Sequence, residues 1–143
     1  MLMGEYHHNI DEKLRIIIPA KFRDEIGNEC VITRGIDECL FVYSLSNWDK
    51  IVKKLETLPF TKKDARNFNR MFFSGATNCK FDKMGRVKLT NPLCSYASLN
   101  KECIIIGVSN RLEIWSIDKW MDYFLENKDN ISSIADNLFS SEV

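Results

Sequence analysis

Two stretches of the sequence decide the fold: DEKLRIIIP at residues 11–19 and DKMGRVKLT at residues 82–90. Each begins with the pattern Asp-x-x-x-Arg and continues with alternating apolar residues. An Asp side chain can accept nearby backbone N–H groups, so Asp11 and Asp82 are predicted to shape tight turns. Gly85 readily adopts positive φ, whereas Leu14 stands at that position in the first turn. Either the two turns differ in shape, or the first accepts a small strain.

The strands that follow the turns are predicted to display their arginines. Side chains alternate along a strand, so Arg86 and Lys88 share one face of the second one. Lys88 must face water or a charged partner, and Arg86 therefore faces outward as well. By the same alternation, Arg15 and Ile17 are predicted to point outward, with the isoleucine between them pointing inward.

The second half of the chain repeats the first. The matching pairs are Asp11 with Asp82, Cys30 with Cys103, and Trp48 with Trp120. Their offsets of 71, 73 and 72 residues are nearly constant. Such an offset, with one-residue drifts inside loops, is typical of an internal repeat.

Each half has the same predicted order of elements: a turn, a short strand, a helical turn, an apolar strand, a second strand and a closing helix. The predicted ranges after each turn are 15–19, 20–27, 29–34, 39–44 and 46–58 in one half, and 86–90, 92–99, 102–108, 112–116 and 117–128 in the other. The first closing helix is predicted to begin at a Ser46 or Asn47 cap, and the second follows Ser116. Halves of about 60 residues are marginal alone. We therefore predict a mainly β fold with flanking helices (α+β), in which two pseudo-equivalent β units pack into one body.

Four segments follow from this order. We predict a first unit with its closing helix at 1–58, a basic linking helix at 59–76, a second unit at 77–128, and an acidic tail at 129–143. The linking helix, TKKDARNFNRMFFSG, is predicted to be capped by Thr61 and ended by Gly75. The tail is predicted to be a short helix or a frayed end.

Charge and cysteine content narrow the classes of function. The 20 basic and 20 acidic residues cancel, but residues 50–88 carry eleven Lys/Arg against three Asp/Glu, and residues 111–143 carry three against seven. Five cysteines without a Cys-x-x-Cys pattern exclude a fully paired disulfide framework and predict reduced, buried thiols and no metal site. No signal peptide or bilayer-spanning run is found, so we expect a cytoplasmic protein.

The outward arginines admit two interpretations. In one, each arginine pairs with its own aspartate at the surface. In the other, the planar guanidinium binds phosphate or a guanine edge, with Lys13 and Lys83 adding positive charge at the tips of the turns. Duplication favours binding, because two equivalent tips can engage a repeated polyanion with avidity.

These residues resemble a known family. The segments GEYHHNIDEKLRIIIPAKFR, CLFVYS, DKMGRVKL and RLEIWSIDKW, with Trp48 between them, are similar to MraZ, a family of bacterial transcriptional regulators built from two AbrB-like swapped-hairpin domains. The likeness runs from Gly4 to Trp120 and includes both copies of the family's Asp-x-x-x-Arg signature. The departures are Leu14, where the family has glycine, and LTNPL after the second copy.

The resemblance implies a regulator of the division and cell-wall gene cluster. It implies double-stranded promoter DNA with short direct repeats as the partner, a ring-shaped homo-oligomer, and a place in the cytoplasm at the nucleoid. It implies no cofactor, no membrane and no small-molecule substrate. The expected DNA-binding residues are Arg15 and Arg86, supported by Lys13, Lys83 and Lys88, with Lys21 and Arg23 as weaker phosphate contacts; Asp11, Asp82 and Gly85 shape the loops.

Three other interpretations stay open. The linking helix places Arg66 and Arg70 at helical spacing and could be a recognition helix, although a solvated face is commoner. The chain could be a ring-forming scaffold without specific DNA readout, with the pairs Tyr43/Trp115 and Trp48/Trp120 at interfaces instead of in the core. An enzyme is the least supported class, since no phosphate-loop, nucleophile-elbow or zinc motif occurs and His7-His8 lacks a third ligand.

Overall fold

The computed structural model describes residues 1–140, and both halves contain the predicted strands and helices. The elements of the first half and the link are β1 (Leu2–Asn9), β2 (Arg15–Ile17), α1 (Ala20–Ile26), β3 (Glu29–Arg34), β4 (Leu40–Ser44), α2 (Leu45–Glu56) and α3 (Lys63–Gly75). Those of the second half are β5 (Thr77–Lys80), β6 (Arg86–Lys88), α4 (Asn91–Tyr96), β7 (Glu102–Ser109), β8 (Leu112–Ser116), α5 (Ile117–Asn127) and α6 (Ile131–Phe139).

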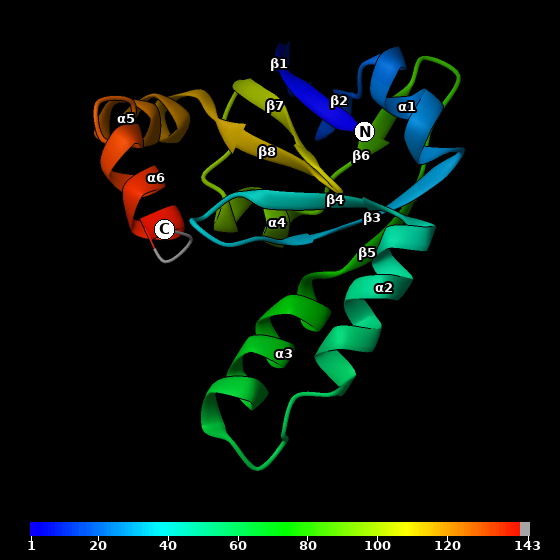
Figure 1. Ribbon diagram of the computed structural model, residues 1–143. Helices are drawn as coiled ribbons and strands as arrows, with labels where there is room; N and C mark the ends of the chain where they lie inside the picture. The colour runs from blue at the N-terminus through cyan, green and yellow to red at the C-terminus, as the bar shows by residue number, and fades with distance from the viewer. Residues whose placement is uncertain (141–143) are drawn as a thin grey trace.

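The strands form one six-stranded antiparallel sheet, in the order β1-β7-β8-β4-β3-β5, and a two-stranded ribbon of β2 and β6. The α2–α3 hairpin extends from one side of this sheet, and α5 and α6 lie at another end (Figure 1). The mainly β fold with flanking helices and two repeated units is therefore confirmed. No helix among the described residues is both long and apolar enough to cross a bilayer.

The two halves exchange their first strands. Strand β1 of the first half pairs with β7 of the second, and β5 of the second half pairs with β3 of the first. Neither β1 nor β5 was predicted, because β1 is mostly exposed along its length and β5 has only four residues. The exchange explains how two marginal halves share one core: each sheet segment needs a strand from the other half.

A pseudo-two-fold axis relates the halves. In the ribbon, Ile16 lies opposite its own repeat equivalent, Val87, and both are buried. In the large sheet, Phe41 lies opposite its equivalent, Glu113. Both of these pairs join equivalent positions of the two halves. The elements that follow the ribbon therefore have equivalent places in the two halves.

Two apolar clusters hold this arrangement. One lies between the ribbon and the large sheet and includes the fully buried Ile16, Ile18 and Phe22. The other lies on the opposite face of the large sheet, where α2 and α3 pack. There the ring centroids of Trp48 and Tyr43 are 6.0 Å apart. All five cysteines are buried and free, as predicted. Burial raises the pKa of the Cys30 thiol to about 12, so that thiol stays protonated at neutral pH.

Two helix caps differ from prediction. The cap of α2 lies two to three residues earlier than predicted, because Ser44 is the cap and its hydroxyl accepts the backbone N–H of Asn47 at 3.2 Å. Helix α3 is not capped by Thr61: its N-cap residue is Lys62, which makes no side-chain capping bond. The predicted tail at 129–143 contains α6, and residues 141–143 lie outside the described residues.

Candidate nucleic-acid interface

The first Asp-x-x-x-Arg turn is organised around the carboxylate of Asp11. Its Oδ1 accepts the backbone N–H groups of Lys13 at 2.9 Å and of Arg15 at 2.8 Å. Its Oδ2 accepts the Nε–H of Arg15 at 2.8 Å. The backbone closes the turn as well, since Leu14 donates to the Asp11 carbonyl at 3.0 Å. One carboxylate therefore fixes both the turn and the arginine that follows it.

The second turn repeats these contacts. Oδ1 of Asp82 accepts the backbone N–H groups of Met84 at 2.9 Å and of Arg86 at 2.8 Å, and Oδ2 accepts Arg86 Nε–H at 2.7 Å. Gly85 donates to the Asp82 carbonyl at 2.9 Å. The residue before each arginine has positive φ, 62° at Leu14 and 78° at Gly85. The turns thus share one geometry, and the first one accepts the strain of a leucine in the left-handed region.

The ribbon places the two turns side by side. Ile18 donates its backbone N–H to the Gly85 carbonyl at 3.0 Å, and Leu89 donates to the Leu14 carbonyl at 2.8 Å. A terminal nitrogen of Arg86 also lies 3.9 Å from Oδ2 of Asp11, an ion pair between the two turns. This pair was not predicted from the sequence, because it depends on the pairing of β2 with β6.

The outer face of the ribbon carries three cations. Arg15 lies opposite Lys88 and Ile17 lies opposite Arg86, and all four point away from the buried Ile16–Val87 pair. Lys88 is exposed, and the side chains of Arg15 and Arg86 keep 30% and 23% of their surface exposed. The predicted outward orientation of these residues is observed, and Ile17 is half-buried.

Further basic residues surround this face. Lys13 and Lys83 are exposed at the tips of their turns, and Lys21 is exposed on α1. No ion pair engages any of these three lysines within residues 1–140. Arg23 is different: its Nε–H donates to the Ile18 carbonyl at 2.9 Å, and its guanidinium lies against Gly85. Arg23 therefore supports the second turn from behind.

The electrostatics of the turns favour charged side chains. The pKa values of Asp11 and Asp82 are lowered, first because the backbone N–H groups of Arg15 and Arg86 bind the carboxylates, and also through their side chains. The Nε–H of each arginine is hydrogen-bonded to its own aspartate, so only the outer edge of the guanidinium remains to bind a ligand. The arrangement is a pair of fixed cationic edges, which suits phosphate or a guanine edge.

The rival helix α3 uses one of its arginines internally. Arg66 donates to the carbonyls of Phe60 at 3.1 Å and Thr61 at 2.9 Å. Arg70 is exposed, and the buried side of the helix carries Ala65 and Phe72. The exposed basic residues of α3 thus lie on the solvent-facing side of the helix. They are not repeated in the other half of the chain, whereas the turns are.

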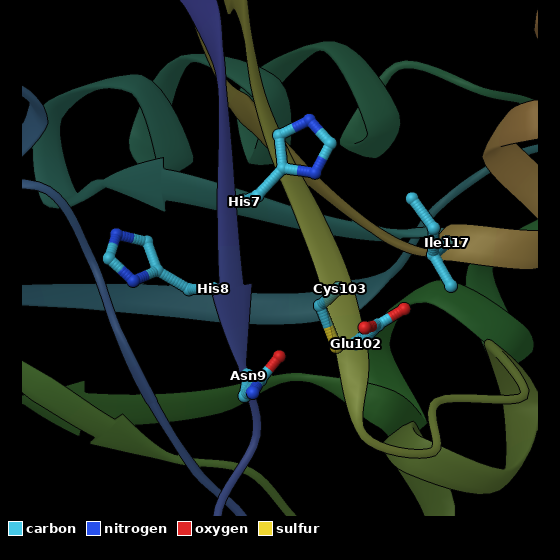
Figure 2. A pocket seen from close by; sticks show the side chains of 6 residues that line it. All are labelled: His7, His8, Asn9, Glu102, Cys103 and Ile117. Carbon is cyan, nitrogen blue, oxygen red and sulfur yellow. The ribbon is translucent and has the colours of Figure 1, made fainter.

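A polar pocket of about 380 Å³ lies beside β1 and β7 (Figure 2). His7 and His8 point away from each other in it, and Glu102 and Cys103 approach from β7. No group of three His, Cys, Asp or Glu residues that could hold a metal ion occurs in the part of the chain that the structure describes.

Comparison with known proteins adds three findings. The family described as "MraZ protein, putative antitoxin-like" matches the chain twice, over residues 1–71 and 72–141. Proteins named "Transcriptional regulator MraZ" from Lactobacillus gasseri and Lactobacillus johnsonii are 54% and 53% identical to it, over the full length of both chains. A solved structure, "The solution structure of PHS018 from pyrococcus horikoshii", is 14% identical over 80% of this chain and 88% of that one; its TM-score of 0.34 supports no argument about this protein.

Proposed function

The chain belongs to the MraZ family, and on that premise we propose that it is a DNA-binding transcriptional regulator. Its ligand is double-stranded DNA with short direct repeats in the promoter of its own gene, within the division and cell-wall gene cluster. The two Asp-x-x-x-Arg turns read these repeats, and the protein works in the cytoplasm at the nucleoid. It needs no cofactor and turns over no substrate.

One observation carries the proposal: two turns of identical hydrogen bonding lie side by side with their arginines on one solvent-facing strand pair. A surface ion pair between each arginine and its aspartate contributes only about 0–1 kcal/mol, so stability alone gives little reason to keep two copies. A two-stranded ribbon is narrow enough to enter the major groove, where arginine binds guanine bidentately. The aspartates hold the arginines for that contact and do not touch DNA.

Binding to the protein's own upstream DNA tests the proposal. The wild-type affinity should exceed that for a scrambled duplex of equal length and composition, and should fall steeply as salt rises from about 50 to 200 mM. Equal affinity for the two duplexes at every salt concentration would contradict sequence-specific regulation.

Assembly into a ring of identical copies is part of the same proposal. Exposed apolar side chains lie on the helices at two ends of the body, on α2–α3 and on α5–α6. Basic residues predominate around them on α2–α3, and acidic residues predominate on α5–α6. The exposed apolar residues include Phe68, Met71, Phe73, Met121, Phe124, Leu125, Ile131, Ile134 and Leu138. Opposite charges favour contact between the α2–α3 end of one copy and the α5–α6 end of the next. Such a head-to-tail contact closes into a ring if its rotation permits.

Sedimentation velocity tests the assembly. Ile131→Ser combined with Leu138→Ser should reduce the assembly to smaller species, because both side chains are about 70% exposed in one copy and lie on the acidic end. Met3→Ser removes an exposed apolar side chain of β1 and should leave the size unchanged. An unchanged size for the double variant would exclude this contact.

The second candidate is a ring-forming scaffold without DNA readout, which the exposed apolar helices favour. It does not account for the duplicated turns. An assembled protein whose DNA affinity is independent of sequence would support the scaffold and refute the regulator.

A further inference from the structure

On the outer face of the ribbon, the pseudo-two-fold symmetry is broken at one position. The repeat equivalent of Ile17 is Lys88, so symmetry would place the same residue opposite each arginine. Instead, Lys88 lies opposite Arg15, and Ile17 lies opposite Arg86. One end of the outer face thus has two cations, and the other end has one cation beside an aliphatic side chain.

The ion pairs sharpen this difference. Arg86 contacts two carboxylates, with Nε 2.7 Å from Asp82 and a terminal nitrogen 3.9 Å from Asp11. Arg15 contacts only Asp11, at 2.8 Å, and no ion pair of Lys88 occurs in the described part of the chain. Positive charge that no acid balances is therefore concentrated at the Arg15–Lys88 end.

Like charges directly opposite each other on an antiparallel pair are destabilising. The Arg15–Lys88 pair faces solvent, so an anionic ligand that lies over both side chains would relieve that repulsion. Ile17 is half-buried and lies on the same solvent-facing side as Arg86. Covering the exposed part of this isoleucine with an apolar group of a ligand would be favourable.

We propose that the ribbon reads DNA asymmetrically: Lys88, beside the reading Arg15, binds a backbone phosphate at one end, and Ile17, beside Arg86, contacts a thymine methyl group at the other. This inference rests on the proposed function. Thymine is the base that presents a methyl group in the major groove. A symmetric ribbon would bind a site equally well in either direction. The substitution at this single repeat position gives each copy a preferred direction, which suits direct repeats.

The Ile17 contact is tested by combining a protein variant with a base change. Replacing thymine by deoxyuridine in the upstream duplex removes the methyl groups and should weaken wild-type binding about four-fold, the equivalent of one buried methyl group. The Ile17→Ser variant has no methyl group at this position and should bind both duplexes equally. Ile36→Ser changes an exposed isoleucine remote from the ribbon and should respond to deoxyuridine as wild type does.

The Lys88 contact is tested by salt dependence. Lys88→Met keeps the length of the side chain without its charge, and should lower the slope of log affinity against log salt by about 0.9, the value for one phosphate. Lys53→Met on α2 should leave the slope unchanged. Thermal unfolding of every variant checks that the ribbon is still folded.

The outcomes separate the two proposals. If wild type shows no preference for the upstream duplex, the proposed function fails. If wild type shows the preference, but Ile17→Ser responds to deoxyuridine as wild type does or Lys88→Met keeps the full slope, the asymmetric readout is wrong and the regulator stands.

Discussion

Leu14 and Gly85 occupy the same left-handed backbone position in two turns that have the same hydrogen bonds, with φ values of 62° and 78°. A leucine in this region costs roughly 1–2 kcal/mol that a glycine does not. The carboxylate of Asp11 thus holds its turn against strain, while that of Asp82 holds a relaxed one. The geometry needed at the arginine is kept although the residue before it differs.

Gly85→Ala should cost more stability in the wild-type background than in an Arg23→Ala background. A Cβ at Gly85 would lie 2.5 Å from the guanidinium carbon of Arg23. The alanine would displace Arg23 from the Ile18 carbonyl, so we expect an additional loss of about 1 kcal/mol in the free energy of unfolding. Urea unfolding measures it.

The Arg23→Ala background provides the control for this prediction. Without the guanidinium, Gly85→Ala should cost only what an alanine in the left-handed region costs. A cost that is the same in both backgrounds would show that Arg23 does not contribute to it.

Acid should destabilise the turns. The pKa values of Asp11 and Asp82 lie below the ordinary value of 3.8 in the folded protein, so the unfolded chain binds protons more readily. The stability that these carboxylates contribute is complete above pH 3.8 and is lost as pH falls through their folded pKa values. As pH falls from 6 to 2, the melting temperature of the double variant Asp11→Asn/Asp82→Asn should fall less than that of wild type. Coincident curves for variant and wild type would contradict this assignment.

Glu113 should depend on Arg111 for its burial. The Glu113 carboxylate is buried, accepts Arg111 at 2.9 and 3.0 Å and accepts the Trp115 indole N–H at 3.1 Å. Arg111→Met would leave a buried charge with a single donor, and we expect a loss of about 2 kcal/mol in unfolding free energy. Lys119→Met breaks an exposed ion pair with Glu38 and should cost less than about 1 kcal/mol. Equal losses for the two variants would refute the role given to Arg111.

Much of the fold was predictable because its signals are local. The alternation in RVKLT determines which residues face outward, and the repeat transfers that result to Arg15. The start of α5 directly after Ser116 was predicted and is observed, and the Ser116 hydroxyl accepts the backbone N–H of Lys119 at 3.1 Å. The cap of α2 was misplaced, because Ser44 and Ser46 are both good caps and only the end of β4 decides between them.

The features that were not predicted depend on contacts between distant segments. Strand β1 carries little apolar alternation, and its pairing with β7 joins residues about 100 positions apart. The sequence likewise does not reveal that Asp11 serves Arg86 as well as Arg15, since that follows from the ribbon. Glu113 occupies the position equivalent to Phe41, and its burial follows from the pairing of β4 with β8.

The most direct test of the central claim compares two variants for binding to the upstream duplex and to its scrambled control. Arg15→Ala/Arg86→Ala removes the reading arginines, and Arg66→Ala/Arg70→Ala removes two arginines of α3. We predict that the first variant, while folded, loses its preference for the upstream duplex and that the second keeps it. Retained preference in the first variant, with loss in the second, would show that α3 reads DNA and that the twin turns serve only the fold.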